Sequence, residues 1–128
     1  MFDHCPIVHT YSRAEAIADG VLIDVSPDAR EAGITLPTAV TSAVWANYVK
    51  VPATATGQDE RGRLWDVLWM LYVAIRRSPD SDAQLLYQLH VRNDDRLVGE
   101  LPLVTLKAIV GPGDTAEPVL TIMMPDED

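Results

Sequence analysis

The 128-residue chain is 48% hydrophobic and 23% charged, a balance that excludes wholesale disorder and is typical of a globular protein. Its length fits one domain over residues 1–128, and its longest apolar run is far below the about 20 residues that cross a bilayer. Cys5 is the only cysteine and the first residues lack the pattern of a signal peptide, so we expect a cytoplasmic protein with no membrane contact.

The net charge of −9 is unevenly distributed along the chain. Residues 34–78 carry five bases and three acids, whereas residues 79–128 carry ten acids and three bases. Acidic charge repels phosphates, so we expect no direct nucleic-acid binding, and it favours basic protein partners. Solubility alone is the other interpretation of this charge. The candidate partner-binding residues are the acids near the C-terminus: Asp114, Glu117, Asp126, Glu127 and Asp128.

Short elements are expected in the first third of the chain. Ser12 and Glu15 have the spacing of a capping box, which predicts a short helix over residues 12–18. Alternating apolar residues predict a strand over residues 21–25. A proline at the start and a glycine at the end favour a helical turn over residues 26–33.

Residues 36–52 form the next predicted helix, which Pro52 ends. Its apolar residues recur at three- and four-residue spacing: Val40, Val44, Trp45, Tyr48 and Val49.

The dominant predicted element is a core helix over residues 59–77. It contains nine consecutive apolar residues, 67–75, with two arginines on each side of them. Acids at its start and arginines at its end complement the helix dipole. Trp65 and Trp69, with Trp45, are an aromatic patch candidate, but their helical spacing favours a place in the core, where this helix would cover a sheet.

After this helix the apolar pattern becomes alternating. It predicts antiparallel strands over residues 85–91, 104–110 and 120–124. The predicted fold is therefore α+β, with N-terminal helices and a long central core helix packed on a C-terminal three- to four-stranded antiparallel sheet. The last strand, residues 119–124, is a candidate exposed edge through which a homodimer would form.

Candidate chemistry is sparse. His4, Cys5 and His9 are the only cluster of metal-ligand residue types, but their spacing is poor for a tetrahedral site, so we expect no metal and no cofactor. Asp24, Asp66 and His90 are the candidate catalytic residues. Asp66 interrupts the apolar core helix, and it is either a general acid or base or the salt-bridge partner of Arg63 or of an arginine elsewhere.

Four segments together resemble a family of small, functionally uncharacterised bacterial proteins. They are residues 11–26 (YSRAEAIADGVLIDVS), 29–45 (AREAGITLPTAVTSAVW), 59–77 (DERGRLWDVLWMLYVAIRR) and 110–128 (VGPGDTAEPVLTIMMPDED). The resemblance implies an origin on plasmids, integrative elements or phages, and it implies no catalytic motif. Small acidic proteins of such elements are often inhibitors of host defence.

We therefore expect a small acidic protein of mobile-element origin that acts by protein contact, as an inhibitor of a host nucleic-acid-handling complex such as restriction or CRISPR. A small enzyme with a carboxylate and histidine site between helices and sheet is the first alternative. A homo-oligomeric accessory protein is the second.

Overall fold

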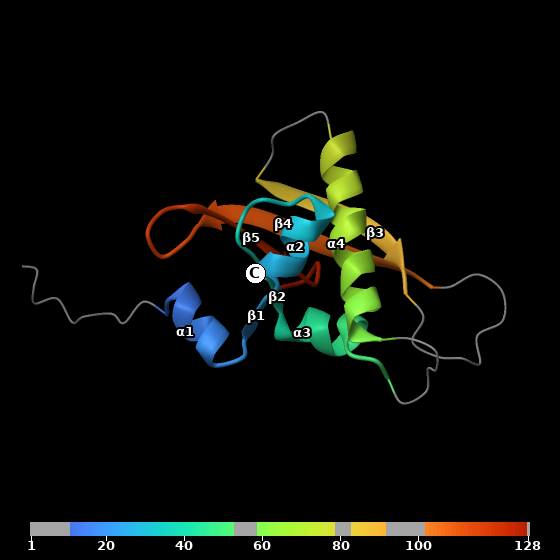
Figure 1. The fold of residues 1–128 in the computed structure, drawn as a ribbon, viewed down its shortest axis with the longest axis horizontal. Helices are drawn as coiled ribbons and strands as arrows, with labels where there is room; N and C mark the ends of the chain where they lie inside the picture. Colours follow the sequence, from blue (N-terminus) through green and yellow to red (C-terminus); the bar gives the residue numbers. More distant parts are fainter. Residues whose placement is uncertain (1–10, 53–58, 79–82, 92–101, 128) are drawn as a thin grey trace, which may run out of the picture.

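The computed structural model describes residues 11–52, 59–78, 83–91 and 102–127. The fold is α+β, as the sequence predicts: helices pack on a five-stranded sheet (Figure 1). The elements in chain order are α1 (Arg13–Ala18), β1 (Leu22–Asp24), α2 (Ser26–Ala32), β2 (Thr38–Thr41), α3 (Ser42–Val44), the π-helix η1 (Trp45–Val49), α4 (Glu60–Arg77), β3 (Gln84–His90), β4 (Leu103–Pro112) and β5 (Pro118–Met123).

Local signals account for the helix ends. The capping box of α1 is present, since the Ser12 hydroxyl accepts from the Glu15 N–H at 3.0 Å and the Glu15 carboxylate accepts from the Ser12 N–H. Gly33 ends α2 in the left-handed conformation, with φ of 104°. Asp59 caps α4 by accepting from the Gly62 N–H at 2.6 Å. The predicted helices at 12–18, 26–33 and 59–77 are confirmed.

The sheet has the order β1-β2-β5-β4-β3. β2 and β5 are parallel, and the other neighbouring strands are antiparallel. The predicted C-terminal strands are confirmed as β3, β4 and β5, but the sheet is larger than the three or four antiparallel strands expected, because β1 and β2 join it. β5 lies inside the sheet, so the prediction that it forms an exposed edge is wrong.

The prediction of one helix over residues 36–52 is wrong at its start. Thr38, Ala39 and Val40 are fully buried in β2. The chain becomes helical only at Ser42, where the hydroxyl of Thr41 accepts from the Val44 N–H at 3.3 Å. A strand buried on both faces shows no alternation, which is why its pattern resembles that of a buried helix.

The core lies between α4 and the sheet (Figure 1). α4 packs against α2, η1 and β3. Four of its apolar side chains are at most 4% exposed: Leu64, Val67, Leu68 and Leu71. Trp65 and Trp69 point away from this core and are 41% and 42% exposed. The prediction that these two tryptophans are core residues is therefore wrong.

Candidate functional site

The most conspicuous feature of the described surface is a row of three stacked aromatic rings on α4. Trp65 and Trp69 lie with ring centroids 5.8 Å apart and planes within 9° of parallel. Trp69 and Tyr72 lie 5.4 Å apart with an interplanar angle of 25°. Steps of four and three residues place all three rings on one side of the helix. We call Trp65, Trp69 and Tyr72 the aromatic row.

An exposed tryptophan pair on a core helix is unusual because indole is among the largest apolar side chains. Surface that is left in contact with water forgoes about 25 cal/mol for each Å² of apolar area. Large exposed apolar groups that cluster, rather than occur singly, mark sites of interaction. The aromatic row is therefore the strongest candidate for a functional surface among the described residues.

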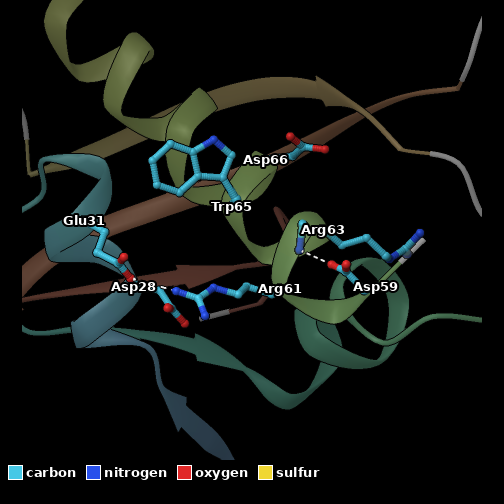
Figure 2. A pocket seen from close by; sticks show the side chains of 8 residues that line it. Asp28, Glu31, Asp59, Arg61, Arg63, Trp65 and Asp66 are labelled. Atoms are coloured by element: carbon cyan, nitrogen blue, oxygen red, sulfur yellow. Dashed lines mark hydrogen bonds and ion pairs between the residues drawn. The ribbon is translucent and has the colours of Figure 1, made fainter. Parts of the chain in front are cut away.

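An open, charged depression of about 690 Å³ lies at the N-terminal end of the row, between α2 and α4. Arg61 of α4 is paired there with Glu31 of α2 at 3.4 Å, and both side chains are well exposed. Figure 2 shows Asp28, Glu31 and Arg61 pointing toward one another, with Trp65 beside them. The group of Asp28, Glu31 and Arg61 thus holds two carboxylates against one guanidinium and carries an excess negative charge.

A more apolar hollow of about 580 Å³ lies at the other end of the row. Tyr72 borders it, together with Ile75, Arg76 and the segment that follows α2. Gly33 permits Tyr72 to lie close to the end of α2, because a Cβ added at this glycine would be 2.8 Å from the Tyr72 ring. The aromatic row therefore connects a charged depression to an apolar one.

Asp66 lines the charged depression but points away from Asp28 and Glu31 (Figure 2). Partial desolvation raises the pKa of its carboxyl, and the positive charge of Arg63 opposes this rise. Burial lowers the pKa of Arg63, whose Nε donates to the Val49 carbonyl at 3.2 Å. Arg63 thus ties α4 to η1, and its positive charge acts on Asp66 without overcoming the desolvation that raises the pKa of that acid.

The three candidate catalytic residues do not share a pocket. Asp24 lies in β1, at one edge of the sheet, where its Oδ1 accepts from the Ser26 hydroxyl at 2.6 Å. His90 lies in β3, at the opposite edge, and is exposed between buried neighbours that face α4. Asp66 lies on α4. This dispersal gives no proton-transfer pair or nucleophile–base pair among them.

Three of the five C-terminal acids that are candidates for partner binding accept hydrogen bonds within the fold: Asp114, Glu117 and Glu127. Asp114 accepts from the backbone N–H groups of Arg13 and Ala14 at 2.8 and 3.0 Å, and these bonds lower its pKa. Glu127 accepts from the Thr41 hydroxyl at 2.8 Å.

Of the remaining candidates in this group, Glu117 accepts from the Thr115 N–H at 3.0 Å within the β4–β5 turn. Asp126 is exposed, and Asp128 lies outside the described residues.

No group of three or more potential metal-ligating side chains occurs within residues 11–52, 59–78, 83–91 and 102–127. His4, Cys5 and His9 lie outside these ranges. In the same part of the chain, no helix is long and apolar enough to cross a membrane.

The sequence indicates which residues of the aromatic row share one side of the helix, because they recur at three- and four-residue spacing. Leu64, Leu68 and Leu71 share one side of a helix, and Trp65, Trp69 and Tyr72 share the adjacent side. Because both sides are apolar, periodicity alone cannot decide which of them faces the sheet.

Comparison with known proteins yields a family and no activity. No curated protein and no solved structure matches the chain. One family model matches residues 1–128, the entire sequence, and its description is a family of unknown function. The chain therefore belongs to the family DUF6573.

Proposed function

We propose that this protein acts by binding another protein and that the aromatic row of α4 is the centre of the contact. The observation that carries the proposal is the 41% and 42% exposure of Trp65 and Trp69 on a helix whose neighbouring leucines are buried. Tryptophan, tyrosine and arginine are the residue types that contribute most to binding at protein interfaces. All three types occur here, since Arg61 and Arg76 flank the row.

The target class that we propose is a host nucleic-acid-handling defence complex, such as restriction or CRISPR, met in the cytoplasm. Two features of the sequence support it. The net charge of −9 steers the protein toward basic surfaces, which proteins that handle nucleic acids expose. The resemblance of four segments to proteins of plasmids, integrative elements and phages supplies the biological setting.

Inhibition of host defence can be measured directly. The protein would be expressed in bacteria that carry a restriction system or a CRISPR system, and the plaquing efficiency of a susceptible phage would be counted. We expect expression to raise plaquing in one of these strains by about tenfold or more, as loss of a defence barrier requires. The double substitution Trp65→Ala/Trp69→Ala should abolish the effect, because truncating interface hot spots costs about 2 kcal/mol or more each.

Leu86→Ala is the matched control. Leu86 is 56% exposed on β3 and alternates with residues that face α4, so its truncation removes exposed apolar surface from another face. This variant should keep full activity, and circular dichroism should show all variants folded. Unchanged plaquing in every strain would reject the target class, and equal activity of the tryptophan variant would reject the surface.

A further inference from the structure

The exposed strip along α4 has the same arrangement of side chains when it is read from either end. The helix has 18 residues. Arg61 is the second residue and Arg76 the second from last, while Trp65 is the sixth and Tyr72 the sixth from last. Trp69 lies next to the midpoint. The strip is therefore a row of aromatic rings with an arginine at each end, symmetric about the middle of the helix.

Such a pattern is what an isologous interface requires. In a two-fold symmetric dimer, the same patch of each copy contacts its own counterpart in reverse order. If two α4 helices lie antiparallel with their midpoints together, Trp65 of one copy faces Tyr72 of the other. The two Trp69 side chains then meet at the symmetry axis. Each ring of the aromatic row is then opposite a ring of the other copy.

Charge at the two ends of the strip fits the same arrangement. Asp28, Glu31 and Arg61 together carry an excess of one negative charge beside the row. Arg76 is exposed near the far end of the same strip. Antiparallel pairing brings Arg76 of the second copy to this group, and two carboxylates then balance two guanidinium groups. The surface is thus its own electrostatic complement.

We infer that a second copy of this chain occupies the aromatic row in the free protein, with the two α4 helices antiparallel. The inference rests on the proposed function insofar as both use this surface. Pairing of two copies and contact with a different partner therefore exclude one another, so the dimer would keep the aromatic row covered until a partner displaces it.

Charge reversal tests this geometry, with self-association measured by sedimentation velocity over a concentration series. Reductant is present throughout so that Cys5 cannot link two chains. Arg76→Glu leaves an excess of two negative charges at each end of the dimer, and Asp28→Lys leaves an excess of two positive charges. The dimer of each variant alone should have a dissociation constant about tenfold or more above that of the unsubstituted protein.

A mixture of the two variants provides the decisive result. In a heterodimer, both ends are again neutral. At one end the glutamate introduced at position 76 meets the lysine introduced at position 28, and at the other end the native Arg76 meets the native Asp28. We expect the dissociation constant of the heterodimer to lie within about threefold of that of the unsubstituted dimer. One variant carries an affinity tag, so that heterodimers are captured and counted separately.

Arg77→Glu is the matched control, since it makes the same change in net charge about 100° further round the helix, away from the aromatic row. It should weaken association little. A monomer at every concentration, or a mixture no tighter than the single variants, would overturn the inference. The plaquing assay is independent of this result, so a monomer whose activity depends on Trp65 and Trp69 would retain the proposed function while rejecting the dimer.

Discussion

Tyr87 places a phenol inside the core, and this burial lowers the stability of the fold at alkaline pH. The side chain is 4% exposed and its hydroxyl donates to the Val67 carbonyl at 3.1 Å. Burial raises the pKa of Tyr87 far above its ordinary value of about 10. A raised pKa in the folded state means that the stabilisation is complete below about pH 10 and is lost as the pH rises above it.

We expect Tyr87→Phe to lower the free energy of unfolding by about 1 kcal/mol at neutral pH, because it removes one buried hydrogen bond. The difference from the unsubstituted protein should shrink, and then change sign, as the pH rises beyond about 10. Urea unfolding over the range from about pH 7 to about pH 11 measures this. A difference that stays constant over that range would show that Tyr87 does not resist ionisation.

Gly33 differs from Gly20 in one respect that substitution can isolate. Both have positive φ, but a Cβ at Gly33 would lie 2.8 Å from the Tyr72 ring, whereas a Cβ at Gly20 would meet nothing within 4 Å. We expect Gly20→Ala to cost about 1 kcal/mol of stability, from backbone strain alone. Gly33→Ala should cost clearly more and should change the tyrosine and tryptophan near-ultraviolet dichroism. Equal losses in thermal unfolding would contradict the close contact between Gly33 and Tyr72.

At the scale of elements, the sequence predicts best those segments whose ends carry their own chemistry. The capping box of α1 and the charged ends of α4 depend on residues within one turn, and both helices form as predicted. β2 depends instead on β5, which lies in the last third of the chain, and a local window contains no sign of that partner. Helical spacing through Val40 is therefore misleading, because the residue is buried by a distant strand.

The orientation of α4 is the property that decides the candidate site, and two adjacent residues test it. Leu68 is fully buried and Trp69 is 42% exposed. We expect Leu68→Ala to lower the free energy of unfolding by about 3 kcal/mol, as large-to-small core substitutions do. Trp69→Ala, measured at a concentration low enough for the protein to be monomeric, should cost about 1 kcal/mol or less, although it removes a larger side chain, because much of the ring is then in water.

Urea denaturation followed by circular dichroism distinguishes these outcomes. Leu68→Ala and Trp69→Ala can be compared with Val67→Ala, a second fully buried position on α4. If the tryptophan substitution were as damaging as the two core substitutions, the helix would present a different side to the sheet. The aromatic row would then be part of the core, and the candidate surface would be lost.

For the molecule as a whole, the sheet order joins the two ends of the sequence. β2, from the first third, lies beside β5, from the last third, and β5 in turn lies beside β4. Arg13 of α1 also donates to the Thr121 hydroxyl at 2.7 Å. These contacts lead us to expect that the chain unfolds as one cooperative unit. The sequence suggests a single domain only through the length of the chain.

Ile122 offers the sharpest test of that expectation. It is fully buried and pairs with Val40 on one side and Ala108 on the other. We expect Ile122→Val to lower the free energy of unfolding by about 1 kcal/mol. All tryptophans lie between residues 45 and 69, far from position 122 in the sequence. Tryptophan fluorescence should nonetheless report the full loss of unfolding free energy, with a urea midpoint equal to that from circular dichroism.

Leu86→Val removes one methylene group, as Ile122→Val does, but from an exposed position on β3, and it should leave both midpoints close to those of the unsubstituted protein. A fluorescence midpoint that does not move while the dichroism midpoint falls would mean that the α4 region unfolds independently of the sheet. Coincident shifts would instead establish that the sheet holds α4 in place. The exposed tryptophans would then owe their fixed position to a core that extends across the whole chain.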